Sequence, residues 1–253
     1  MKRKITILTI AFLSSMLMYA NVFAAATGRC GDSITWTLDD SGNLTLSGSG
    51  EMWNNGYDDS PFKDYEIRKA TVKYGITSIG DCAFYGCSGL TELTLPNSVT
   101  SIGDGAFRGC SGLTELTLPN SVTSIGNAAF VDCTGLTELI LPNSVTSIGE
   151  SAFSGCSGLE KIAVESGNSC YDSRDNCNSI IDTETNTLIV GCKNSVIPNS
   201  VTSIGDSAFS GCSGMTELTL PNSVRSIGNC AFSLCSGLTE LTLPNSLTEI
   251  GKY

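Results

Sequence analysis

Leu90–Gly112 reads LTELTLPNSVTSIGDGAFRGCSG, and Leu113–Gly135 repeats it almost unchanged as LTELTLPNSVTSIGNAAFVDCTG. One aromatic residue marks the same place in successive copies at steps of 23 residues: Phe84, Phe107, Phe130 and Phe153, then Phe209 and Phe232. A fixed period of about 20–29 residues is the signature of a solenoid, in which each unit packs on its neighbours. The repeat therefore predicts the architecture. The repeat says less about function, because near-identical copies mainly reflect the packing of each unit on its neighbours.

Each copy combines a strand with a compact turn. In Leu90–Gly112 the residues spaced to face inward are Leu90, Leu93, Leu95, Val99, Ile102, Ala106, Phe107 and Cys110. The first three form the L-x-x-L-x-L strand of a leucine-rich repeat, and Pro96, which lacks an N–H, marks its end. The last three are spaced for one helical turn. We therefore expect a leucine-rich repeat solenoid of short parallel β-strands with helical or 3-10 turns.

The first 26 residues resemble a secretory signal. Lys2, Arg3 and Lys4 precede an apolar run over 5–18, and the alanines at 24–26 offer an A-x-A cleavage site. The alternative is a membrane anchor, but the apolar run is short for a span. We therefore expect residues 1–26 to be a signal peptide and the protein to be secreted, with no membrane span.

Residues 27–66 lie outside the repeat pattern and are predicted to form an N-terminal cap. Ile34, Trp36 and Leu38 alternate with polar residues, and the polar stretch 39–43 precedes Leu44 and Leu46. This pattern indicates a β-hairpin. Ser60-Pro61 suits the start of a short helix. The end of a solenoid needs such a cover because its last apolar face has no neighbour.

Residues 67–253 are predicted to form the solenoid, with units beginning at Ile67, Leu90, Leu113, Leu136, Leu159, Cys192, Met215 and Leu238. The irregular unit at about 159–191 lacks the phenylalanine turn, and its segments 179–181 and 187–190 predict a β-hairpin around 182–186. The last repeat is incomplete and has no C-terminal cap. A truncated chain, an interrupted gene and a partner that covers this end all remain open at this point.

The chain is acidic. It holds 14 Lys and Arg against 25 Asp and Glu, and the net charge of −11 becomes −14 once the three basic residues of the signal are removed. Such a charge disfavours nucleic acid and anionic lipid as partners.

Half of the 12 cysteines follow the repeat. They lie three residues after each phenylalanine, at Cys87, Cys110, Cys133, Cys156, Cys212 and Cys235. Stacked side chains point in parallel, whereas a disulfide needs converging Cβ atoms. We therefore expect buried free thiols in this column, with disulfides as the alternative. The state of the other six stays open: Cys30, Cys82, Cys170, Cys177, Cys192 and Cys230.

No catalytic or metal-binding pattern is present. The chain has no histidine, which removes Ser-His-Asp and Cys-His catalysis and the commonest metal ligand. Asp172, Asp175 and Asp182 match no established calcium loop, and the cysteine spacings suit zinc poorly. The expectation is a protein without enzyme activity, cofactor or metal.

The candidate binding surface is the outward side of the L-x-x-L-x-L strands, which we expect on the concave face. Glutamates recur at one outward position and threonines at the next, and the pattern changes in the fourth and fifth units. The candidate residues are Glu92, Thr94, Glu115, Thr117, Glu138, Ile140, Lys161, Ala163, Glu217 and Glu240. The functional interpretation is an acidic strip for a basic partner. The alternative is a solvated column that keeps the protein soluble, with drift in the repeat at Ile140 and Ala163.

The repeat pattern SIGxxAFxxCxxLxxLxLPxSV resembles the BspA-like leucine-rich repeat family of bacterial surface proteins over about Ile67–Gly251. The stretch CGDSITWTLDDSGNLTLSGSGEM (Cys30–Met52) resembles the cap segment that often precedes such repeats, and YDSRDNCNSII (Tyr171–Ile181) with the following TLIVGCKNSVIP is similar to a variant repeat of that family. The resemblance implies a secreted or surface-exposed, non-catalytic protein, often one that mediates adhesion to host or matrix proteins.

Two kinds of function follow from these patterns. The leading expectation is an extracellular or cell-surface protein that binds another protein or a glycan. The alternatives are the targeting region of a larger secreted enzyme and a truncated gene fragment.

Overall fold

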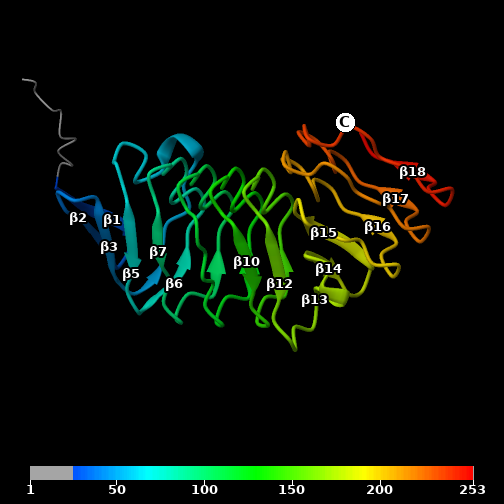
Figure 1. Cartoon of the computed structure of the whole chain (residues 1–253). Helices are drawn as coiled ribbons and strands as arrows, with labels where there is room; N and C mark the ends of the chain where they lie inside the picture. The colour runs from blue at the N-terminus through cyan, green and yellow to red at the C-terminus, as the bar shows by residue number, and fades with distance from the viewer. Residues whose placement is uncertain (1–24, 253) are drawn as a thin grey trace, which may run out of the picture.

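The structure is a computed structural model that describes residues 25–252 of the 253-residue chain. The chain winds from one end of an elongated solenoid to the other, and the stack changes direction near β13–β15 (Figure 1). Nearly all of the predicted signal peptide, residues 1–24, lies outside the described residues. Ala26 begins the first strand, β1 (Ala26–Gly31).

Three antiparallel strands form the N-terminal end. β2 (Ile34–Leu38) pairs antiparallel with β3 (Asn43–Gly48), which is the hairpin expected from the alternating pattern. β1 pairs antiparallel with β2 and was not anticipated from the sequence. β3 pairs parallel with β5 (Lys69–Val72), so the hairpin continues directly into the first sheet of the repeats.

The L-x-x-L-x-L positions form the first face of the solenoid. β5 pairs parallel with β7 (Glu92–Thr94), and β10 (Glu138–Leu141) pairs parallel with β12 (Lys161–Val164). The strand expected from Leu113 was wrong, because residues 114–118 adopt no strand between β7 and β10. The strands expected from Met215 and Leu238 are reduced to one isolated bridge between Thr219 and Thr242.

A second parallel sheet, not predicted, runs through the T-S-I-G segments before the irregular unit and includes two residues of the N-terminal end. Its strands are two to four residues long, too short to show a strand period: β4 (Gly50–Glu51), β6 (Ile76–Ile79), β8 (Ser101–Ile102), β9 (Ser124–Ile125) and β11 (Ser147–Ile148). In the units of β8, β9 and β11, hydroxyl groups bond to carbonyls of the unit before. Thr123 Oγ1 donates to Thr100 O over 3.1 Å, and Ser121 Oγ donates to Val99 O over 2.6 Å. These bonds keep equivalent residues in register.

The phenylalanine turns form the third column, and they are not helical as expected. Residues in each turn have positive φ, such as Gly105 at 59° and Ala128 at 52°, a conformation that cannot continue a right-handed helix. Within residues 25–252 the helical segments are the 3-10 turns η1 (Tyr57–Asp59) and η2 (Arg174–Asn176). The short helix expected at Ser60-Pro61 is instead η1 followed by turns over 61–64.

Stacked aromatic rings fill the centre of the solenoid. Phe84, Phe107 and Phe130 are fully buried, and neighbouring rings in the column lie 5.1–5.3 Å apart between centroids. Phe62 extends the stack into the N-terminal end, with its centroid 5.0 Å from that of Phe84. The buried residues fall into two hydrophobic clusters, which divide at the irregular unit.

The irregular unit replaces the phenylalanine turn with antiparallel strands. β13 (Tyr171–Asp172) pairs with β14 (Ser179–Asp182), and β14 pairs with β15 (Thr187–Gly191). β15 then pairs parallel with β16 (Ser203–Ile204), which continues through β17 (Ser226–Ile227) to β18 (Glu249–Ile250). The second sheet thus restarts after the irregular unit.

Candidate functional site

The predicted binding residues of the first five units lie along one face. β7 follows β5 in register, so Glu92 pairs with Lys69 and Thr94 with Thr71. β12 follows β10, so Lys161 pairs with Glu138 and Ala163 with Ile140. All ten predicted residues are exposed except Glu138 and Ala163, which are partly buried.

Ion pairs change the charge of the predicted acidic strip. Lys69 Nζ lies 2.7 Å from Glu92 Oε2, and Lys161 pairs with Glu138. Glu115 lies between these two pairs and makes no ion pair in the described part of the chain. The sequence reasoning missed Lys69, although it stands 23 residues before Glu92 and so occupies the same outward position.

The unpaired glutamate coincides with the missing strand. Like charges that face each other across strands oppose pairing, and Glu115 has a glutamate in the unit on each side. Its segment 114–118 is where β7 and β10 fail to join. A shallow hollow of about 510 Å³ opens there between Thr91–Thr94 and Thr114–Thr117. The structure therefore brings four predicted residues to one place: Glu92, Thr94, Glu115 and Thr117.

The other predicted residues are placed differently. Ile140 is 43% exposed and stands beside Ala163, next to the Lys161–Glu138 pair. Glu217 lines a separate groove beyond the irregular unit together with Lys193 and the exposed Val196. Glu240 is exposed in the last unit and lines neither space. The ten residues are therefore not one continuous site.

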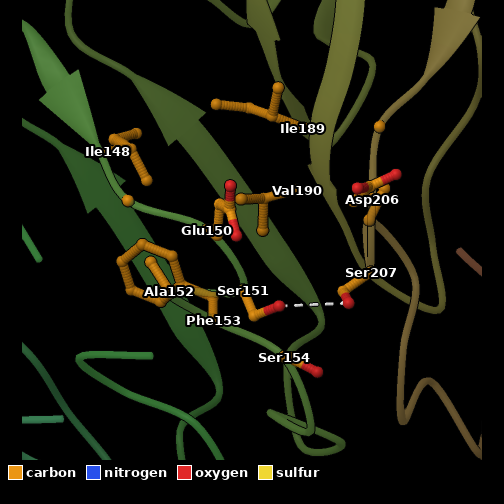
Figure 2. A pocket seen from close by; sticks show the side chains of 13 residues that line it. Ile148, Glu150, Ser151, Ala152, Phe153, Ser154, Ile189, Val190, Asp206 and Ser207 are labelled. Atoms are coloured by element: carbon orange, nitrogen blue, oxygen red, sulfur yellow. Dashed lines mark hydrogen bonds between the residues drawn. The ribbon is translucent and has the colours of Figure 1, made fainter. Parts of the chain in front are cut away.

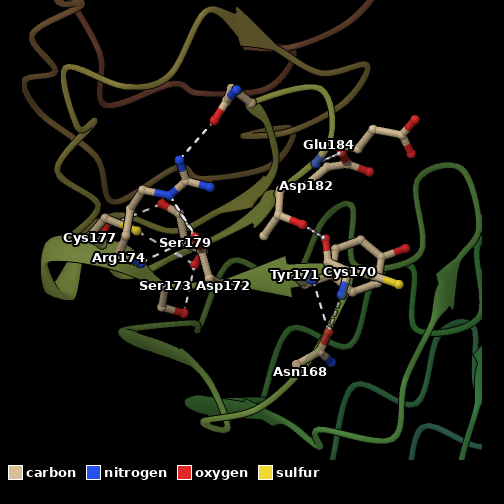
Figure 3. A network of polar contacts seen from close by, with 12 residues as sticks. Asn168, Cys170, Tyr171, Asp172, Ser173, Arg174, Cys177, Ser179, Asp182 and Glu184 are labelled. Atoms are coloured by element: carbon tan, nitrogen blue, oxygen red, sulfur yellow. Dashed lines mark hydrogen bonds and ion pairs between the residues drawn. The ribbon is translucent and has the colours of Figure 1, made fainter.

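The polar side chains of the irregular unit hold its own backbone (Figure 3). Arg174 Nε lies 2.8 Å from Asp172 Oδ1, and Arg174 Nη1 donates to Asn186 Oδ1 over 2.8 Å. Asp182 Oδ1 accepts from the amide of Thr185 over 2.8 Å and so closes the turn of the hairpin. Within residues 25–252, no three His, Cys, Asp or Glu side chains gather as a possible metal site.

The cysteine column has the predicted geometry, and five of its six thiols contact a backbone carbonyl of an earlier unit. Cys110 Sγ lies 3.2 Å from Phe84 O, and Cys133 Sγ lies 3.2 Å from Phe107 O. All twelve cysteines are free. Burial raises the pKa of Cys87 to about 12 and raises the pKa of Cys110 well above its ordinary value. These thiols are therefore protonated and unreactive at neutral pH.

We expect alkylation to separate the cysteines by exposure. In the native reduced protein, iodoacetamide should label the two partly exposed cysteines, Cys170 and Cys230, before any other. After denaturation without reductant, at least the six column cysteines should take up the label, because no disulfide protects them. Mass spectrometry of the peptides measures both. Column cysteines that stay unlabelled in the denatured, unreduced protein would contradict the free-thiol column.

The repeat geometry agrees with a known family. The family model for the BspA type leucine rich repeat region matches six copies over residues 57–182 and 186–253. The chain belongs to the BspA-type leucine-rich repeat family. A search of curated protein sequences gave no significant match.

Solved structures of bacterial leucine-rich repeat proteins share the fold. A leucine-rich repeat protein from Eubacterium ventriosum is 28% identical, with a TM-score of 0.70 over 90% of this chain and 68% of that chain. The pneumococcal vaccine antigen PcpA is 18% identical, with a TM-score of 0.60 over 91% and 78% of the two chains. A leucine rich cell surface protein from Faecalibacterium prausnitzii is 24% identical, with a TM-score of 0.51 over 90% and 79%. Because they are only 18% and 24% identical, the last two structures show a shared fold and nothing more.

The family match supports a binding scaffold, since leucine-rich repeat solenoids are extended surfaces for partner proteins. In the described residues, no helix is long and apolar enough to cross a bilayer.

Proposed function

We propose that this protein is secreted, associates with the cell surface and binds an extracellular protein through the outward face of its first five units. The partner contributes lysine or arginine side chains, and no reaction is catalysed. The observation that carries this proposal is the hollow around Glu115, whose carboxylate has no ion-pair partner within residues 25–252 and stands between two glutamates that have one.

The charge pattern favours a local basic contact over a long acidic strip. Lys69 and Lys161 close the column at its two ends, so the negative charge left for a partner is concentrated on Glu115. A cation that entered the hollow would also meet the hydroxyl groups of Thr94 and Thr117, which line it. Complementary charge of this kind governs the association rate and specificity, and salt screens it.

An apolar contact adjoins the charged one. Ile140 stands in the column that Thr94 and Thr117 occupy in earlier units, and its side chain is 43% exposed. With Ala163 beside it on β12, it offers apolar surface next to the Lys161–Glu138 pair. A polar rim around a small apolar centre is the usual composition of protein interfaces.

The experiment uses residues 27–253 against immobilised matrix and cell-surface proteins, with a glycan panel in parallel. Once a ligand is found, Glu115→Lys should weaken its binding by at least about tenfold at low salt, because a desolvated charge pair is replaced by repulsion. Surface plasmon resonance across a salt series measures the change.

Glu184→Lys is the matched control. It makes the same charge change at the exposed tip of the β14–β15 turn, away from the outward face of the repeats, where its side chain points away from the polar network (Figure 3). Equal losses in both variants would indicate a general charge effect and refute the proposed contact. Binding confined to uncharged glycans would also refute it.

A further inference from the structure

The column of hydrogen bonds between phenylalanine turns is interrupted at one place. In a regular step, three alternate amides donate to the next turn: Ala128 N to Glu150 O over 2.9 Å, Phe130 N to Ala152 O over 2.8 Å and Asp132 N to Ser154 O over 2.9 Å. In the following step only the third of these backbone bonds remains, from Gly155 N to Ser210 O over 2.8 Å, and a side-chain bond joins Ser151 Oγ to Ser207 Oγ over 3.1 Å. The turns after β11 and after β16 therefore lack two of the three backbone bonds of a regular step.

The irregular unit causes this interruption. It has no phenylalanine turn of its own, and β15 lies against the turn of the next unit instead. Gly191 N donates to Ala208 O over 2.8 Å, and a Cβ on Gly191 would lie 2.1 Å from the ring of Phe209. Because Gly191 occupies that position, the amides of Ser151 and Phe153 have no hydrogen-bond partner within residues 25–252. Unpaired amides at buried positions such as Phe153 are rare in folded proteins.

A cavity of about 180 Å³ lies between the two turns (Figure 2). Apolar side chains from three units line it: Ile148, Ala152, Phe153, Ile189, Val190 and Ala208. Cavities of about 150 Å³ lined by such residues take up benzene. Phe153 stacks on Phe130 at 5.2 Å, and Phe209 stacks on Phe232 at 5.4 Å, but in the described chain Phe153 and Phe209 make no ring contact. The aromatic column thus stops at this cavity.

Two carboxylates flank the opening, Glu150 on one turn and Asp206 on the other (Figure 2). Asp206 Oδ1 accepts from Asn229 N over 2.6 Å, as the equivalent side chains do in regular units. The Glu150 carboxylate has no hydrogen bond or ion pair in the described residues. The opening therefore combines two unpaired amides, which need an acceptor, with negative charge that needs a cation.

We propose that this cavity binds an aromatic α-amino acid, either free or as the amino-terminal residue of a peptide. The ring continues the stack on Phe153. The carboxylate or carbonyl oxygen accepts from the amides of Ser151 and Phe153, and the ammonium group lies between Glu150 and Asp206. This site is separate from the outward face of the repeats, so its test is independent of the proposed function.

Isothermal titration calorimetry of residues 27–253 with L-phenylalanine tests the proposal. Phenethylamine, which lacks the carboxylate, and 3-phenylpropionate, which lacks the ammonium, should each bind at least about tenfold more weakly, since each loses a charge-assisted bond. Leucine should also bind more weakly because it cannot stack. Tighter binding of Phe-Gly-Gly than of the free amino acid would assign the site to peptide amino termini. If neither L-phenylalanine nor Phe-Gly-Gly binds at up to millimolar concentration, the proposal is overturned.

Two substitutions locate the binding. Glu150→Gln should weaken the binding of L-phenylalanine by at least about tenfold. The substitution removes the one flanking carboxylate that makes no bond within the described residues and is therefore free to bind the ammonium group. Ala152→Leu should fill the cavity and abolish binding while the fold is kept. Ala129→Leu is the control at the same position of a regular turn, where the added volume should lower the melting temperature and leave binding intact. Unchanged binding in both Glu150→Gln and Ala152→Leu would place the ligand elsewhere and refute the site.

Discussion

Replacing Phe130 with alanine is expected to lower the free energy of unfolding by about 3–5 kcal/mol, among the largest effects of any single substitution in this chain. The Phe130 ring is fully buried and stacks on both neighbours, at 5.3 Å from Phe107 and 5.2 Å from Phe153. Its loss leaves a cavity between two units, and a solenoid is stabilised mainly through such contacts between neighbours. Urea denaturation followed by circular dichroism measures the change.

Phe232→Ala provides the matched control at the same repeat position. Within the described residues the Phe232 ring contacts one phenylalanine, Phe209 at 5.4 Å, and it is only partly buried in the last phenylalanine turn. We expect its removal to cost less than half as much as the removal of Phe130. Equal costs at the two positions would show that stacking on both sides adds nothing, contrary to the solenoid argument.

The second large effect is a loss of stability at alkaline pH. Burial raises the pKa of the thiols of Cys30, Cys87 and Cys212 to about 12 in the folded state, from 9.0. Below pH 9 these thiols are protonated in both the folded and the unfolded state, so they do not make stability depend on pH there. Between about pH 9 and pH 12 the unfolded chain releases protons that the folded chain keeps, and stability therefore falls as the pH rises.

The size of this effect follows from the number of thiols. Each one lowers the free energy of unfolding by about 1.4 kcal/mol per pH unit in that range. Together the three would remove about 4 kcal/mol by pH 10, a large part of the 5–15 kcal/mol typical of native proteins. The free energy of unfolding from urea titrations in reductant, measured from pH 8 to pH 10.5, should decrease at least this steeply, because burial also raises the pKa of Cys110, and the Cys133 side chain together with burial raises that of Cys156.

Cys87→Ala and Leu90→Ala distinguish titration from packing. Cys87→Ala should reduce the alkaline slope by about 1.4 kcal/mol per pH unit, because one thiol no longer titrates. Leu90 is fully buried, and its amide bonds to Cys87 O, so Leu90→Ala should lower stability at every pH and keep the slope. A slope that Cys87→Ala leaves unchanged would mean that this thiol does not cause the pH dependence.

The sequence predicts the structure best where a side chain contacts the equivalent side chain of the neighbouring unit. The 23-residue spacing of phenylalanine and cysteine predicted the stacked rings and the thiol column, because equal spacing places equal residues together. The helical turn was wrong because positive φ at positions such as Ala128 and Ser151 breaks the helix, and five of the six residues at this position are neither glycine nor one of the types that favour positive φ. Spacing alone does not reveal such a backbone.

The candidate site was harder to predict because it depends on differences between copies. Glu115 has the same local sequence as Glu92, yet its strand is missing and its charge is unpaired. The cause lies in other units, at Lys69 and Lys161, and a reading of one repeat at a time cannot show it. The junction cavity depends on where β15 meets the next turn, which is a long-range packing result.

The hydroxyl bonds between units have a consequence for the length of the protein. Thr123 bonds to Thr100, and Thr146 bonds to Thr123, so these regular units carry both the donor for the unit before them and the acceptor for the unit after them. Within this run of regular units, duplication or deletion of 23 residues restores the same bonds, whereas other lengths do not. Among the units before the irregular one, deletion of Leu113–Gly135 would leave Glu92 and Glu138, each with its own lysine. The bonds in the interior are therefore compatible with different numbers of whole repeats, and they do not fix the length of the chain.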